Sequence, residues 1–254
     1  MSAPLVTYAV DGAVAHVELN RAEVSNALDL PTAEALGAAI DRASGDAEVG
    51  VLLLTGAGPR FCAGGDVASF VAAGDQPTYL RELATVLDGV TQRVAAMPKP
   101  VVAGVQGAVA GAGLALMLSC DLIVAEVSTR FVTAYAGIGL TPDCGLSYLL
   151  PRAVGQQRAL ELLLTGRRLT AEEALGWGLV SEVVDDGGGA RRAAGLATVL
   201  AGGPQFALGQ ARALARSSWE TPRSAVGLEE ARVIAEAVGH PDAQARIAAF
   251  TSRR

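Results

Sequence analysis

The stretch from Pro100 to Cys120, which carries no charged residue, constrains the fold of this 254-residue chain more than any other. Its first part, Pro100–Val105, is apolar and largely β-branched, and this pattern predicts a buried strand. Glycines then break the strand pattern, and Leu114–Ser119 predicts an apolar helix. A helix that starts directly after such a turn leaves unpaired N–H groups in its first turn, where its dipole adds about half a positive charge. The turn can therefore bind an anion, or an oxygen atom that gains negative charge during a reaction.

Three interpretations of this glycine-rich turn stay open when it is considered alone. It can be the start of a tightly packed core helix. It can be part of a dinucleotide-binding fingerprint, because Gly111 and Gly113 form a G-x-G, although Leu116 stands where the third glycine belongs. It can also be an oxyanion-binding turn, provided that a second donor comes from elsewhere in the chain.

The composition of the chain limits its partners and its location. With 51% hydrophobic and 18% charged residues, it can bury a large core. Its net charge of −6 argues against nucleic acid as the main partner, because phosphate binding needs a dense basic surface. Gln106 and the glycines divide the uncharged run, so we expect a core unit and no membrane partner. Cys62, Cys120 and Cys144 form no C-x-x-C pair, which favours reduced thiols and a cytoplasmic protein.

The order of the predicted elements indicates an α/β fold. Val6–Val10 and Val14–Leu19 flank Asp11-Gly12, a strong hairpin signal, and Val49–Leu54 predicts a strand that is buried on both faces. Strands alternate with helices early in the chain, and none is predicted late. After a polar hinge at Asp185–Gly189, the pattern predicts helices alone. Helices are also predicted from Pro31, over about 78–95, and over 146–154, 157–164 and 171–177.

A second glycine turn, Gly64-Gly65-Asp66, follows the strand at Val49–Leu54 as the Gly111 turn follows the strand before it. Asp66 is a good N-cap, so Gly65 can offer its N–H just before a helix. Two such N–H groups on neighbouring strands can converge on one carbonyl oxygen. The local pattern leaves open the alternative of two unrelated tight turns.

Five motifs resemble those of the crotonase (enoyl-CoA hydratase/isomerase) superfamily. They are NRAEVSNALD at 20–29, FCAGGD at 61–66, VQGAVAGAGLALMLSCD at 105–121, GIGLTPDCG at 137–145 and LTAEEALGWGLVSEVV at 169–184. They occur in the order that the superfamily has, and they extend over nearly the whole chain.

This resemblance implies a crotonase-like spiral of repeated ββα units over residues 1–190, which binds the substrate. It implies a C-terminal helical trimerisation segment over residues 191–254, and hence a homotrimer or a dimer of trimers. The implied substrate is an acyl-CoA thioester. No cofactor apart from the coenzyme A of the substrate is implied, and no metal.

The resemblance also implies roles for individual residues. The N–H groups of Gly65 and Ala112 would hold the thioester oxygen, and the carbonyl of Ala63 would face the adenine of coenzyme A. The implied substrate-binding residues are Arg21, Ala63, Gly64, Asp66, Gly111, Ala115 and Tyr135. Arg253 and Arg254 are further candidates for the coenzyme A phosphates, with a solvated tail as the alternative.

The chain departs from the superfamily's hydratases at two positions. Those hydratases carry two glutamates that activate water, and the alignment places Ala115 and Tyr135 there. Alanine has no acid group and tyrosine titrates near pH ~10, so efficient hydration is disfavoured. What remains is Asp143, which by local pattern alone is a turn or N-cap aspartate for the helix near Gly145. In the superfamily its position matches the single catalytic aspartate of some isomerases, including the ring-epoxide isomerase of phenylacetate catabolism.

The resulting hypothesis is an acyl-CoA isomerase in which Asp143 shuttles a proton and the Gly65 and Ala112 amides hold an enolate oxygen. The alternatives are an enoyl-CoA hydratase of low activity and a non-catalytic acyl-CoA-binding homologue. His16 and His240, the two histidines, are predicted on an early strand and at a surface turn. They therefore indicate neither a Ser–His triad nor a zinc site.

Overall fold

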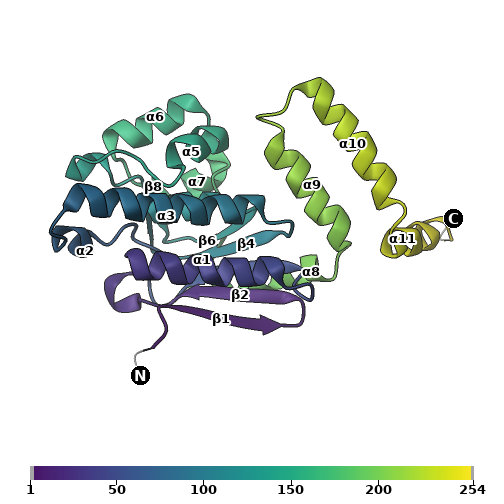
Figure 1. Cartoon of the computed structure of the whole chain (residues 1–254), viewed down its shortest axis with the longest axis horizontal. Helices are drawn as coiled ribbons and strands as arrows, with labels where there is room; N and C mark the ends of the chain where they lie inside the picture. The colour runs from purple at the N-terminus through teal and green to yellow at the C-terminus, as the bar shows by residue number, and fades with distance from the viewer. Residues whose placement is uncertain (1–2, 253–254) are drawn as a thin grey trace.

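A six-stranded sheet forms the centre of the computed structural model, which describes residues 3–252 (Figure 1). The strand order is β1–β2–β3–β4–β6–β9, and neighbouring strands are parallel except for the β1–β2 hairpin. The hairpin predicted at Asp11-Gly12 is confirmed, and every residue of β3 is buried, as its apolar sequence predicts. The strands are β1 (Val6–Asp11), β2 (Val14–Leu19), β3 (Val51–Gly56), β4 (Val101–Val105), β6 (Leu122–Glu126) and β9 (Glu182–Val184).

A second, smaller sheet lies beside the first and has the order β5–β7–β8. Its strands are β5 (Ala108–Ala110), β7 (Arg130–Val132) and β8 (Leu169–Thr170). Two isolated parallel bridges, Leu28 with Gly65 and Cys62 with Val109, add further extended pairs. From β4 and from β6, the chain runs from the large sheet into the small one and then into a helix. This arrangement confirms the predicted spiral of ββα units.

The short strands correct the expectation that strands are absent late in the chain. The glycines after Val105 predicted a turn, yet residues 108–110 form β5, and β7, β8 and β9 follow later in the chain. Strands of two or three residues are too short to show an alternating pattern. They form because the chain path brings another segment alongside them, and this pairing is invisible in the local sequence.

Four of the core helices, α1, α2, α3 and α7, begin at a side-chain cap. Asp29 accepts the Thr32 N–H at 2.9 Å, and Thr170 and Glu173 form a reciprocal capping box. The core helices are α1 (Leu30–Gly45), α2 (Val67–Val71), α3 (Gln76–Ala96), α4 (Ala112–Leu118), α5 (Leu146–Val154), α6 (Gln156–Thr165), α7 (Ala171–Trp177) and α8 (Gly189–Ala201), with 3₁₀ turns η1 (Ala22–Val24) and η2 (Ala136–Ile138).

Helices cover both faces of the large sheet. Leu52 and Leu54 of β3 pack in the main core with side chains of α1 and α3, whereas Val51 and Leu53 pack with Ala193 of α8. The boundary predicted at residue 190 therefore falls inside α8, a helix that belongs to the core.

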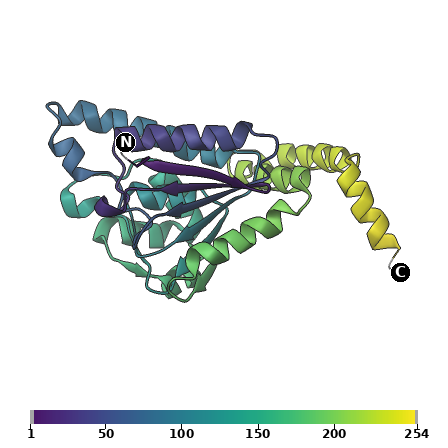
Figure 2. The same cartoon turned by 90° about the horizontal axis from the view of Figure 1, so that it is seen from below.

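Beyond α8, a C-terminal arm of three helices extends away from the sheet (Figures 1 and 2). The arm consists of α9 (Gln205–Ser217), α10 (Arg223–Ala237) and α11 (Pro241–Thr251). Its helical character agrees with the sequence pattern. Between residues 3 and 252, none of the helices combines the length and the apolar character needed to cross a membrane.

Two arginines of α9 fasten the arm to the core. The Arg212 guanidinium donates to Asp121 at 2.5 Å and to the carbonyls of Val94, Ala95 and Met97 at the end of α3. Arg216 donates to the other oxygen of Asp121 at 2.8 Å. Asp121 ends the uncharged stretch, so its carboxylate needs a cation from a distant part of the chain.

Candidate active site

Backbone pairing brings the two predicted glycine turns together. Cys62 and Val109 form a parallel bridge, in which the Cys62 carbonyl accepts the Ala110 N–H at 3.0 Å. Because the two segments run in the same direction from this bridge, Gly65 and Ala112 both follow it by three residues. A methyl group added to Gly64 would lie 3.6 Å from the Ala112 nitrogen, which shows how closely the turns approach.

The N–H groups of Gly65 and Ala112 are available to a ligand. Neither donates to an acceptor within residues 3–252. The Ala112 N–H belongs to the first turn of α4, where no intrahelical acceptor exists. A methyl group added to Gly65 would meet no atom within 4 Å, so the space beside it is open. Gly111, just before α4, has a φ of 51°, a conformation that favours glycine.

The Asp143 carboxylate lies beside the start of α4. The Tyr135 hydroxyl donates to Asp143 Oδ1 at 2.6 Å, and a methyl group added to Gly111 would lie 3.7 Å from the same hydroxyl oxygen. The Tyr135 hydroxyl thus lies between Asp143 and Gly111, the residue before Ala112. Burial is the main cause of the raised pKa of Tyr135, and the nearby charge of Asp143 raises it further. Tyr135 therefore stays protonated and remains a donor.

The two cysteines that flank these loops are buried thiols. Burial raises the pKa of Cys62 to about 12, and the Cys62 thiol donates to the Asn26 carbonyl at 3.2 Å. Burial and the Asp143 charge also raise the pKa of Cys144. A neutral, buried thiol is a poor nucleophile, so both side chains act as small packing groups.

Two charged residues of the predicted set hold the Gly64-Gly65-Asp66 turn in place. Arg21 donates to the Ala27 carbonyl at 2.6 Å and pairs with Asp29 at 3.2 Å and with Asp66 at 3.1 Å. The Arg21 side chain is 14% exposed and pairs with two carboxylates, so it offers little charge to a phosphate group. Asp66 also caps α2 by accepting the Ser69 N–H at 3.3 Å.

Among the other residues of the predicted set, Ala63 and Ala115 differ in accessibility. Ala63 is partly exposed, and its carbonyl accepts no hydrogen bond from residues 3–252. Ala115 is fully buried inside α4, so its methyl group packs in the core and does not line an open surface. Arg253 and Arg254 lie outside the described residues.

Replacing Gly113 with alanine should separate the two glycine turns and lower the turnover number about 10²-fold. A Cβ atom at Gly113 would lie 2.6 Å from the Cys62 carbonyl oxygen and 2.7 Å from the Cys62 Cβ, so the backbone must shift. Steady-state kinetics measure the effect. Gly195→Ala in α8 is the matched control, because a Cβ atom there meets nothing within 4 Å. Equal turnover in the two variants would contradict this geometry.

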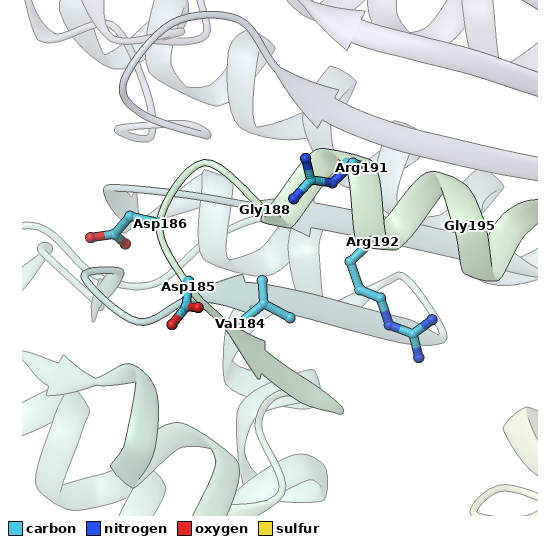
Figure 3. A pocket seen from close by; sticks show the side chains of 7 residues that line it. All are labelled: Val184, Asp185, Asp186, Gly188, Arg191, Arg192 and Gly195. Atoms are coloured by element: carbon cyan, nitrogen blue, oxygen red, sulfur yellow. The ribbon is translucent and has the colours of Figure 1, made fainter.

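Two hollows of the surface lie away from the predicted site. One, of about 1110 Å³, separates α3 and α5 from α9 of the arm and is lined by Met97, Tyr148 and Trp219, among others. The other, of about 390 Å³, lies between the end of β9 and the start of α8, where Figure 3 shows two aspartates and two arginines. Arg192 there pairs with Glu182 at 2.8 Å, and Asp186 accepts the Ser128 N–H at 3.0 Å. None of the predicted site residues lines either hollow.

The contact between Tyr135 and Asp143 was not predicted. The resemblance implied only that Tyr135 binds the substrate. The available signal was the Gly137 and Gly139 pair between the two residues, which allows the chain to fold back. His16, on β2 beside Thr55, and His240, just before α11, lie where the sequence predicted them.

The crotonase fold is a spiral of ββα units in which two adjoining turns each present a free amide, and this is the architecture described above. A sequence model described as "Enoyl-CoA hydratase/isomerase" matches residues 9–254. The chain therefore belongs to the enoyl-CoA hydratase/isomerase family of enzymes.

Individual relatives differ in the reaction that their names describe. The chain is 39% identical over 202 residues to 1,2-epoxyphenylacetyl-CoA isomerase of Escherichia coli, covering 79% of this chain and 77% of that protein. It is 36% identical over 247 residues to 4-chlorobenzoyl coenzyme A dehalogenase-1 of Arthrobacter, covering 94% and 88%. The crystal structure of an enoyl-CoA hydratase from Mycobacterium smegmatis superimposes with a TM-score of 0.92 at 30% identity, covering 99% of this chain and 98% of that one.

Proposed function

We propose that the chain is an acyl-CoA isomerase that shifts a double bond or rearranges a ring through a thioester enolate. The observation that carries this proposal is the Asp143 carboxylate in contact with the Tyr135 hydroxyl, which lies against Gly111 at the start of α4. The similarity to an epoxyphenylacetyl-CoA isomerase supports the same reaction class.

The proposed mechanism uses one acid and two amides. The thioester oxygen accepts hydrogen bonds from the N–H groups of Gly65 and Ala112. Asp143 removes a proton from a carbon in conjugation with the thioester, and the electron pair moves onto that oxygen. The protonated Asp143 then returns the proton two carbons away, which restores the thioester carbonyl and leaves the double bond moved. One oxyanion donor typically contributes about 2.7–4 kcal/mol to such a transition state.

Hydration fits the chain less well. Adding water across a double bond requires groups that hold and deprotonate a water molecule. Ala115 is buried and has no acid group, and the raised pKa of Tyr135 removes it as a base at neutral pH.

We also propose that the arm mediates assembly into a homotrimer or a dimer of trimers. It exposes large apolar side chains, including Leu228 at 76% and Ile234 at 71%, more than an isolated helical arm keeps in water. Light scattering after size-exclusion chromatography tests this assembly. The three cysteines are free and buried, which suits a reducing cytoplasm. The unpaired Ala63 carbonyl suits the amino group of the adenine of coenzyme A.

A panel of 2-enoyl-, 3-enoyl- and arylacetyl-CoA thioesters tests the proposed reaction. Product analysis in deuterated water identifies both the bond that moves and the carbon that gains a proton. We expect isomerised products with solvent deuterium at one carbon. Rapid formation of 3-hydroxyacyl-CoA would instead favour hydration, and binding without any product would favour a non-catalytic role.

A further inference from the structure

The best-defined polar contact at the site joins two side chains that are eight positions apart. The Tyr135 hydroxyl donates to Asp143 Oδ1 at 2.6 Å, a short hydrogen bond of the kind that a charged acceptor makes. Among residues 3–252, the Cys144 thiol also interacts with this carboxylate by a side-chain hydrogen bond. A thiol is a weak donor, so the short bond from the Tyr135 hydroxyl to Oδ1 is the strong contact that distinguishes the two oxygens.

Tyr135 is itself held at both ends. Its carbonyl accepts the N–H groups of Ile138 at 3.1 Å and Leu140 at 3.0 Å, which fixes the backbone at η2. Its ring packs against the main hydrophobic core. A phenol held in this way can fix the plane of the carboxylate that it contacts, because its hydroxyl cannot follow a rotation of Asp143.

We propose that Tyr135 is the positioning residue of Asp143: its hydroxyl holds Oδ1, so that Oδ2 is the oxygen that carries the proton between two carbons of the substrate. This inference rests on the proposed isomerase function. Tyr135 stands at a position where the superfamily's hydratases carry a glutamate, and the inference gives this tyrosine the role of orienting the base. A proton shuttle needs this control, because a carboxyl group that rotates between the two transfers loses alignment with the second carbon.

The experiment compares Tyr135→Phe with Asp143→Asn and with Tyr8→Phe. Tyr8 is the matched control, because its buried hydroxyl has no hydrogen-bond partner within residues 3–252. For Tyr135→Phe we expect kcat to fall about 10–10²-fold, with KM and Tm close to the wild-type values. We expect the acid limb of its pH–rate profile to move to higher pH, because a donor to the carboxylate favours the ionised form. Tyr8→Phe should change none of these quantities.

The other titratable groups near Asp143 do not account for a shift of the acid limb of the pH–rate profile. The Cys144 thiol adjoins Asp143, and its pKa is raised by burial and by the charges of Asp143 and Asp88. It therefore stays neutral, and Tyr135→Phe leaves Asp88 of α3 unchanged.

The possible results distinguish a failure of the positioning role from a failure of the proposed isomerase mechanism. If wild type is active, Asp143→Asn is inactive and Tyr135→Phe keeps the wild-type kcat and pH profile, only the positioning role is overturned. A fall in activity that is matched by a fall in Tm, with an unchanged pH profile, also overturns it in favour of a packing role. If Asp143→Asn retains full activity, the proposed mechanism fails and the positioning role fails with it.

Discussion

Replacing Asp143 with asparagine should lower isomerase turnover by about 10²–10⁴-fold while leaving the affinity for acyl-CoA nearly unchanged. Asparagine keeps the shape of the side chain, and its carbonyl oxygen can still accept the Tyr135 hydroxyl that Asp143 accepts at 2.6 Å. It cannot take up and return a proton in the neutral pH range. Turnover with the preferred thioester and calorimetric titration with a non-reacting acyl-CoA measure the two quantities separately.

Asp186→Asn is the control for this variant. Asp186 is a carboxylate at the hollow between β9 and α8 (Figure 3), where it accepts the Ser128 N–H. Its loss should leave kcat at the wild-type value. If Asp143→Asn turns over as fast as Asp186→Asn, another group carries the proton and the single-carboxylate mechanism is wrong.

Replacing Arg212 with alanine should destabilise the fold by about 3–5 kcal/mol, the usual cost of removing one partner of a buried ion pair. Asp121 keeps Arg216 as a partner, so much of this loss comes from the other acceptors of Arg212. The Arg212 side chain is 6% exposed, and it satisfies Asp121 together with three carbonyls at the end of α3. Without it, those carbonyls lose their donor and α9 loses its main polar link to the core. For a chain of this size we expect Tm to fall by about 6–20 °C in thermal unfolding followed by circular dichroism.

Arg232→Ala provides the matched comparison. Arg232 also pairs with two carboxylates, Glu229 at 2.5 Å and Glu236 at 2.8 Å, but all three side chains are about half exposed on α10. Exposed pairs of this kind contribute about 0.2–1 kcal/mol, so Tm should change little. If Tm falls equally in the two variants, Arg212 does not anchor the arm.

The sequence alone determined the longer helices and strands of this protein and the identity of its family. Pro31 marked the start of α1, the pattern over 171–177 marked α7, Asp11-Gly12 marked the hairpin, and the apolar sequence of β3 marked a strand buried on both faces. These features depend on interactions within a few residues, so propensity, capping and hydrophobic period report them directly. The family was predicted in the same way, because its motifs are contiguous stretches of chain.

Only the tertiary structure decided which distant groups meet. The bridge between Cys62 and Val109 aligns two glycine turns, and Asp121 lies under arginines of a helix 91 positions or more further along the chain. The Tyr135 hydroxyl holds Asp143, and Arg21 joins Asp29 to Asp66 of the Gly64-Gly65-Asp66 turn. Each of these contacts depends on the path of the backbone between its partners. The packing of the whole core fixes that path, and it cannot be predicted from a local pattern of residue types.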